Sequence, residues 1–273
     1  MRLGIVFLPV QNTAAGTPVR RIVDTARRVE ALGFAGLWMT DSVGRGPASL
    51  DPLIALSAAA AVTESIELGT CVLQVPIRPP VDAAHRIRSL DALAGGRLRL
   101  GVGTGSTQAD FSLFGADYES RFRALPEVLD TMRAVWRGEP VAGVTLAPWT
   151  GMPAAPPILL GAWRSQRWIE RAAQECEGWL ASGIHSSWED LERGIGLYRA
   201  AGGKRAAVAN VSIDIRDEPK VTPLGAHSKI SLICTPAEAR ERLMRLADLG
   251  FDDVLLIAPA DAPHQLEAIR QLL

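Results

Sequence analysis

The sequence predicts a (β/α)8 barrel of the TIM type, an α/β fold, from three observations. The chain has 273 residues, which is a usual length for one such barrel. Eight short apolar runs recur along it, as buried parallel strands do. Stretches of helical length separate these runs, and regular alternation of strand and helix is typical of this fold. An open, doubly wound sheet is the competing architecture.

The eight predicted strands are short and apolar, and they follow one another at the spacing of repeated βα units. Their ranges are Leu3–Leu8, Gly36–Thr40, Ile66–Val72, Leu98–Val102, Ile158–Gly161, Gly178–Ala181, Val208–Ile213 and Val254–Ile257. Because the alternation runs from end to end without a linker, we expect residues 1–273 to form one barrel domain.

Helix signals lie between these strands. In Val19–Leu32 the apolar residues fall at helical spacing, with arginines on the other face. Asp51 followed by Pro52 predicts an N-cap and a first helical residue. Thr235 with Glu238 predicts a capping box, and Ser187 is a candidate cap for the helix near residues 191–198.

Two segments are longer than a bare barrel needs, so we predict insertions after the fourth strand and around the seventh. Gln108–Pro156 contains one predicted helix, Arg121–Trp136, and a loop rich in proline, glycine and tryptophan. Arg216–Ile230 is polar and contains two prolines. Long insertions in barrels tend to lie over the functional site.

Composition excludes several classes of function. The formal net charge of -1 gives no bulk electrostatic case for binding nucleic acid or an acidic membrane. Three widely spaced cysteines suggest no disulfide framework, and the histidines show no metal-ligand spacing. No stretch reaches the roughly 18 apolar residues of a membrane span. We therefore expect a cytoplasmic protein that binds no metal.

Catalytic residues of barrel enzymes lie at the C-terminal ends of strands. Asp41, after the second strand, is either a polar anchor for a ligand or a brace for its own loop. Cys71, in the third strand, is more typical of an inert packed thiol than of a nucleophile. Gly101, Gly103 and Gly105, around the end of the fourth strand, allow either close approach of backbone to a ligand or a tight turn.

The fifth strand ends at Gly161, followed by Ala162, Trp163 and Arg164, where a helix is predicted to begin. A helix N-terminus beside small residues and an arginine favours binding of an anion. The alternative is an ordinary helix start. Phosphate sites late in the barrel are common in enzymes of this fold.

Several motifs together resemble the bacterial luciferase-like family. They are ALGFAGLWMTD at 31–41, IELGTCV at 66–72, LDALAGGRLRLGVGTG at 90–105, Pro157–Ala162 and Glu177-Gly178-Trp179. The resemblance covers about residues 1–185. It implies a barrel that binds reduced FMN or coenzyme F420 at its C-terminal mouth, and a homodimer.

The same resemblance implies roles for particular residues. Cys71–Val72 maps to a bulge with a non-proline cis peptide behind the flavin ring. Gly103 and Gly105 match the family's glycine cluster, and Gly161–Arg164 match its phosphate loop. There Ala162 replaces the usual second glycine, and Trp163-Arg164 is an unusual pair. The family commonly has an acid/base histidine after the acidic residue of the second strand, where this chain has Ser42. Asp41 and Ser42 are therefore the candidate catalytic pair.

The leading hypothesis is a monooxygenase that uses reduced FMN, supplied by a separate reductase, and O2 to oxidise a small organic substrate. An F420-dependent hydride-transfer enzyme is the close alternative. A third hypothesis is a flavin-binding barrel without turnover. An isomerase or aldolase is disfavoured, because the strand ends show no lysine or paired carboxylates.

Overall fold

The computed structural model describes residues 1–8, 17–147, 149–151, 155–215, 218, 223–258 and 265–272. Within them, eight parallel strands close into a ring in which the last strand pairs with the first and with the seventh. These strands are β1 (Arg2–Phe7), β2 (Gly36–Met39), β3 (Glu67–Thr70), β5 (Leu98–Gly103), β6 (Ile158–Gly161), β7 (Gly178–Ser182), β8 (Arg205–Asp214) and β10 (Asp253–Ile257). The predicted (β/α)8 barrel is confirmed, and its eight strands match the eight predicted runs.

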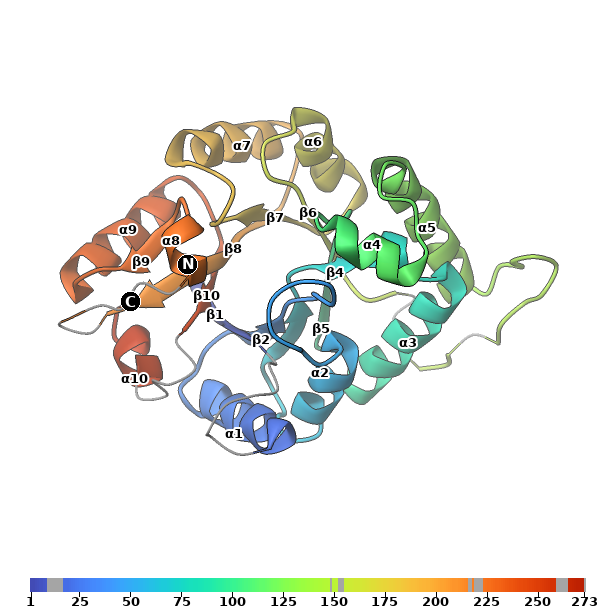
Figure 1. Ribbon diagram of the computed structural model, residues 1–273, viewed down its shortest axis with the longest axis horizontal. Coiled ribbons are helices and arrows are strands. Elements are labelled where there is room, and N and C mark those ends of the chain that lie inside the picture. The colour runs from blue at the N-terminus through green and yellow to red at the C-terminus, as the bar shows by residue number, and fades with distance from the viewer. Residues whose placement is uncertain are drawn as a thin grey trace.

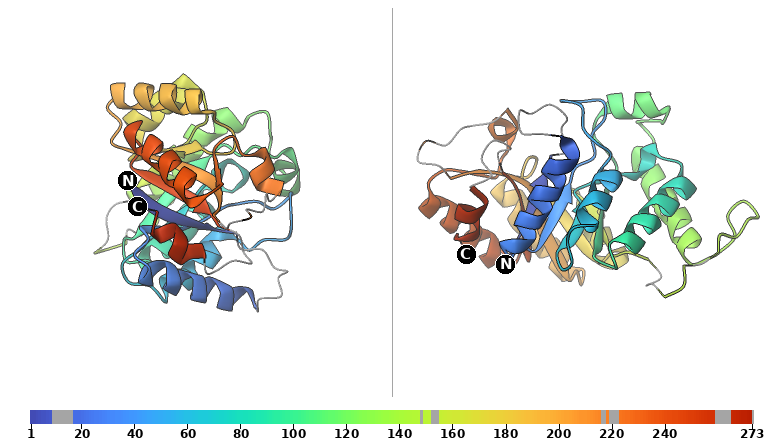
Figure 2. Two further views of the ribbon diagram at one scale, coloured as in Figure 1. Left: turned by 90° about the vertical axis from the view of Figure 1, so that its left-hand side faces the viewer. Right: turned by 90° about the horizontal axis from the view of Figure 1, so that it is seen from below.

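Helices lie around this ring, most of them on its outer side, with the short α4 and α8 over one end of it (Figures 1 and 2). They are α1 (Pro18–Ala31), α2 (Pro52–Ala60), α3 (Pro80–Leu93), α4 (Gln108–Phe114), α5 (Arg121–Trp136), α6 (Gln166–Glu175), α7 (Trp188–Ala200), α8 (Pro223–His227), α9 (Pro236–Asp248) and α10 (Gln265–Arg270). The predicted caps form at Asp51, Ser187 and Thr235. Asp51 accepts from the backbone N–H groups of the first helical turn, and the other two close capping boxes.

Two short strands extend the barrel strands at the C-terminal end. The predicted run Ile66–Val72 is interrupted, because β3 ends at Thr70 and β4 (Leu73–Gln74) follows after two residues, leading into the 3-10 turn η1 (Val75–Ile77). β9 (Ser231–Ile233) pairs with the end of β8. Residues 71 and 72 therefore stand between two short strands instead of inside one.

The two predicted insertions differ from expectation in detail. The first contains α4 as well as the predicted α5. Beyond α5, part of the first insertion projects away from the barrel past α3 (Figures 1 and 2). Parts of both insertions lie outside the described residues: Pro148 and residues 152–154 of the first, and residues 216–217 and 219–222 of the second. His264 lies outside them as well.

The barrel interior is filled by apolar side chains from most of its strands. Trp38 of β2 is buried there, and a side-chain carbon at Gly69 of β3 would lie 2.2 Å from its ring. The interior cluster consists of Val6, Trp38, Cys71, Leu159, Leu180, Ala207, Ala209, Leu255 and Ile257. A second, larger cluster packs the outer faces of the strands against the helices. The barrel is therefore a packed core with its open end at the C-terminal mouth.

Charged residues close the opposite end of the barrel. Glu67, the first residue of β3, accepts hydrogen bonds from Arg99 at 3.0 Å and from Arg205 at 2.6 Å. Arg205 also bonds Asp253, which pairs with Arg2. These ion pairs join β1, β3, β5, β8 and β10 at the N-terminal end of the barrel, the end that serves stability in enzymes of this fold.

Candidate functional site at the barrel mouth

The segment after β3 forms the centre of the candidate site. The peptide bond between Cys71 and Val72 is cis, as the resemblance implies. The Cys71 N–H donates to the carbonyl of Met39 on β2 at 2.9 Å, and Thr70 Oγ1 donates to the carbonyl of Gly101 on β5 at 2.7 Å. Cys71 is buried, whereas Val72 is partly exposed, so its side chain is the part of this segment that borders the mouth.

The glycines of the neighbouring strands make room for this segment. A Cβ atom at Gly101 would lie 1.8 Å from the Thr70 carbonyl oxygen, and one at Gly103 would lie 2.6 Å from Val72 Cγ2. At Gly161 of β6 the corresponding distance, to Val72 Cγ1, is 3.0 Å. Gly103 and Gly161 thus accommodate the Val72 side chain, and their predicted contact with a cofactor stays a prediction.

Gly105 has a different structural reason. Its φ of +80° lies in the left-handed region that favours glycine, and a Cβ there would lie 2.6 Å from Gln74 Oε1. It marks the turn from β5 into the segment that leads to α4.

Asp41 is buried in an ion pair beneath the loop that follows β2. Its carboxylate accepts from Arg78 Nη1 at 2.6 Å and from Arg78 Nη2 at 3.0 Å. The backbone N–H of Gln74 donates to it as well, at 2.9 Å. The structure therefore places Asp41 as a brace between the end of β2 and the segment from β4 to Arg78, and its catalytic role stays a prediction.

Ser42 lies beside this brace in the β2–α2 loop. Its hydroxyl exchanges hydrogen bonds only with Arg45 among the described residues. Asp110 of α4 holds the same loop, because its buried carboxylate accepts from the backbone N–H groups of Val43 and Gly44 and from Gln74 Nε2. The sequence did not identify Asp110, since a helix at this position was not predicted.

The predicted phosphate loop lies at the end of β6. Ala162 is buried and accepts a hydrogen bond from Trp179 Nε1 at 2.8 Å, while Trp163 and Arg164 are exposed. The helix that follows, α6, has Ser165 at its N-cap position, but the Ser165 side chain makes no cap hydrogen bond and the first turn has no acidic residue. Its first N–H groups and its positive dipole end are thus suited to an anion.

An aromatic pair joins this loop to the next one. The rings of Trp163 and His185 stack with centroids 3.8 Å apart, and Ser186 Oγ donates to the Trp163 carbonyl at 3.1 Å. His185 follows β7, where its backbone N–H donates to Ser182 Oγ. The stacking therefore brings His185 against the phosphate loop.

Three cations, here called the basic cluster, are near enough to His185 for their charges to act on its imidazole. They are Arg45, Arg164 and Lys229, which come from three different loops. Burial lowers the pKa of His185, and the positive charges of the basic cluster lower it further. The imidazole is therefore neutral at pH 7 while the surrounding field is positive, which favours a bound anion.

The Cys71 thiol has no features of a nucleophile. Burial alone raises the pKa of this thiol, so it stays protonated at neutral pH. Its Sγ lies 3.7 Å from the side-chain oxygen of Asn210 on β8, and Asn210 Nδ2 donates to the Cys71 carbonyl at 3.2 Å. Asn210 was not identified from the sequence.

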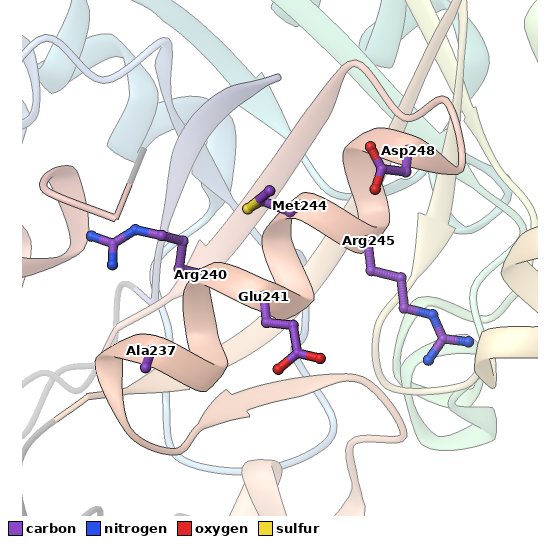
Figure 3. A pocket seen from close by; sticks show the side chains of 6 residues that line it. All are labelled: Ala237, Arg240, Glu241, Met244, Arg245 and Asp248. Carbon is purple, nitrogen blue, oxygen red and sulfur yellow. The ribbon is translucent and has the colours of Figure 1, made fainter.

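A shallow hollow on the outer surface of α9 is separate from the mouth. Its six lining residues all belong to that helix, and their side chains spread outward from it (Figure 3). Because one helix forms the whole lining, it does not enclose a ligand. In the described part of the chain, no group of three His, Cys, Asp or Glu residues is arranged to hold a metal. The helices there are all too short or too polar to cross a bilayer.

Comparison with known proteins places this geometry in a family. Among curated relatives, 4-hydroxyprotoasukamycin monooxygenase of Streptomyces nodosus subsp. asukaensis is 36% identical over 133 residues, which cover 48% of this chain and 36% of that protein. The 5,10-methylenetetrahydromethanopterin reductase of Methanolobus tindarius is 30% identical over 224 residues, which cover 79% and 63%.

Solved structures share the fold over nearly the whole chain. Monooxygenase RslO1 from Streptomyces bottropensis has a TM-score of 0.84 at 20% identity, covering 100% of this chain and 98% of that one. The oxygenating constituent of 3,6-diketocamphane monooxygenase from Pseudomonas putida, solved with FMN, has a TM-score of 0.77 at 17% identity, covering 99% and 95%. The family model for luciferase-like monooxygenases matches residues 1–216 of 273. The protein therefore belongs to the luciferase-like monooxygenase family.

Proposed function

We propose that this protein is a flavin-dependent monooxygenase that uses reduced FMN and O2 to oxidise a small organic substrate at the mouth of a single barrel domain, residues 1–273. The observation that carries the proposal is the meeting of two segments far apart in sequence. Val72 Cγ1 lies 3.0 Å from the position of a Cβ at Gly161, so the segment after β3 adjoins the start of the phosphate loop.

The residues present fit a ligand with a flat apolar ring and an anionic tail. Val72, beside Gly103, would border the ring. Ala162, Trp163 and Arg164, with the uncapped start of α6, would hold the phosphate, supported by the basic cluster. Reduced FMN, when bound, supplies two electrons, so that one atom of O2 enters the substrate and the other leaves as water.

The protein's own part in this reaction is to bind, orient and exclude water. Asp41, held by Arg78, fixes the β2–α2 loop that carries Ser42 at the mouth. We assign the Ser42 hydroxyl as the local proton donor and acceptor in place of the family histidine. Ser42→Ala should lower turnover, whereas Ser42→His should introduce an ionisation near the ordinary histidine pKa of about 6.5 into the pH profile. Unchanged turnover in Ser42→Ala would remove this assignment.

The basic cluster favours a second candidate, an F420-dependent hydride-transfer enzyme. Three cations from three loops exceed what one phosphate needs, and the polyglutamate tail of F420 carries further negative charges. Both candidates place the cofactor at the same mouth, and its anionic tail is the part on which the basic cluster bears.

An anaerobic titration with reduced FMN and with F420H2 side by side, read by fluorescence, tests both candidates. Tighter binding of reduced FMN supports the monooxygenase, and tighter binding of F420H2 supports hydride transfer. Binding with no oxidation of any substrate would indicate a flavin-binding barrel without turnover. Binding of neither cofactor would refute the proposal.

A homodimer, a separate flavin reductase and a cytoplasmic location complete the proposal. Three unpaired cysteines fit a reducing compartment. The adjacent helices α2 and α3 expose Ile54, Val81 and Leu93, which are candidates for a dimer contact. Light scattering should give twice the chain mass of 29.2 kDa, and Ile54→Glu should lower it. A wild-type mass of one chain would refute the dimer.

A further inference from the structure

Asn210 has an unusual backbone conformation within β8. Its φ of +60° lies in the left-handed region, which few residues other than glycine adopt and which asparagine tolerates best. The pairing with β10 shifts at this point, because Val254 lies opposite Val208 and Leu256 lies opposite Val211. Two residues of β8 therefore face one of β10, which is a β-bulge that redirects a side chain.

The redirected side chain reaches the segment after β3, on the opposite side of the ring. Asn210 Nδ2 donates to the carbonyl of Cys71 at 3.2 Å, and Asn210 Oδ1 lies 3.7 Å from Cys71 Sγ. β5, β6 and β7 separate β3 from β8 on one side of the ring, and β2, β1 and β10 do so on the other. The amide therefore spans the barrel at the level of its mouth.

This contact leaves part of the amide unused. A primary amide has two N–H donors and an oxygen with two lone pairs. Within the described residues, the amide uses one donor and one acceptor position, both on Cys71. Asn210 is also partly exposed, unlike Cys71. Its remaining capacity therefore borders the mouth instead of the core.

We propose that Asn210 is a positioning residue for the cofactor: its amide fixes the Cys71–Val72 segment, against which the ring of the bound flavin or deazaflavin lies. This inference rests on the proposed function, since it needs a cofactor at the mouth. The same two strands are joined at the other end of the barrel by Arg205 and Glu67. Asn210 thus supplies at the mouth a connection without a net charge.

Three variants separate the amide from the backbone conformation. Asn210→Gly removes the side chain and keeps the left-handed conformation accessible. Asn210→Asp keeps the shape and tolerates the same φ, but its carboxylate has no hydrogen to donate to the Cys71 carbonyl. Cys71→Ala removes only the thiol contact and serves as the control with a smaller expected effect.

The readouts are the dissociation constants for reduced FMN and F420H2, the circular dichroism of bound oxidised FMN, and the melting temperature. We expect Asn210→Gly to weaken cofactor binding about three- to tenfold, because it loses both the hydrogen bond to the Cys71 carbonyl and the weaker thiol contact. Asn210→Asp should weaken it further, because two oxygens then face each other. The dichroism of bound FMN should change in both, which a purely structural role would not require.

Wild-type affinity and an unchanged spectrum in both Asn210 variants would overturn the inference. If Asn210→Gly does not fold, the nearly isosteric Asn210→Asp decides by the same criteria. Should the wild-type protein bind neither cofactor, the proposed function fails first and the inference fails with it. If the wild-type protein binds a cofactor and both Asn210 variants bind it equally well with the same spectrum, the role of Asn210 is rejected and the proposed function stands.

Discussion

The fit of Val72 between two glycines gives a quantitative test of the candidate site. In Gly103→Ala the new Cβ would lie 2.6 Å from Val72 Cγ2, whereas Val72 Cβ lies at 3.5 Å. One methyl group is therefore the obstacle. Val72 is branched at Cβ and stiff in χ1, and its other methyl already lies beside Gly161. Because neither side offers room, we expect a loss of about 1–3 kcal/mol in the free energy of unfolding.

Val72→Ala removes both methyl groups and with them the clash. Alone it should cost about 1 kcal/mol, because its two methyl groups are partly exposed and a buried one is worth about 0.8 kcal/mol. In the double variant the new Cβ would meet no Val72 methyl, so the two losses should not add. We expect a favourable coupling energy of about 1–2 kcal/mol in the double-mutant cycle.

Urea unfolding of the four proteins at pH 7 measures this coupling. Gly161→Ala serves as the graded control, since its Cβ would lie 3.0 Å from Val72 Cγ1 and should cost less than Gly103→Ala. Losses that add to within about 0.5 kcal/mol would refute the reasoning, because the two positions would then not share a contact.

Three further predictions address the barrel and its charges. In α7, Gly194→Ala should destabilise the protein, because its Cβ would lie 2.6 Å from a buried tryptophan ring. The exposed Gly196 has nothing within 4 Å of such a Cβ, so Gly196→Ala should stabilise the protein by roughly 0.5–1 kcal/mol. Thermal unfolding measures both. Burial opposes ionisation of Glu67, but the hydrogen bond from Arg205 and nearby arginine charges outweigh it and lower its pKa. Glu67→Gln should therefore cost about 2–4 kcal/mol at pH 7, and the difference should shrink as the pH falls through that lowered pKa, as urea midpoints would show. A bound anion should raise the lowered pKa of His185, so the advantage in FMN affinity of the wild-type protein over His185→Gln should shrink as the pH rises through the pKa of His185 in the complex, as FMN titrations at a series of pH values would show.

Much of the fold could be predicted, because strand and helix periods are local properties of the sequence. All eight apolar runs became barrel strands, and the caps at Asp51, Ser187 and Thr235 formed where side-chain type and spacing predicted them. The helix α4 was missed because its seven residues span less than two full turns of pattern and begin without a side-chain N-cap hydrogen bond.

The site could be predicted only in part, because its contacts join residues that are distant in sequence. Gly103 was assigned to a ligand contact, but the structure shows Val72 as its neighbour, and no local pattern reports that. Asn210 contacts a residue 139 positions away. One signal was present, since asparagine is depleted in strands and stands here inside an apolar run.

The two ends of the barrel differ in how charge is used: the closed end has ion pairs that join strands, and the mouth has an uncharged contact. β3 and β8 are joined at the closed end by Glu67 and Arg205, which are charged, and near the mouth by Asn210 and the Cys71 backbone, which are not. An ion pair at the mouth would leave a strong field if a ligand displaced one partner. The amide of Asn210 is uncharged and would leave no such field. The positive charges of the basic cluster act instead on His185, beside the phosphate loop. The mouth thus has an uncharged contact, between Asn210 and Cys71, and a positively charged region at the basic cluster. This is the distribution of charge expected for a ligand with an uncharged ring and an anionic tail.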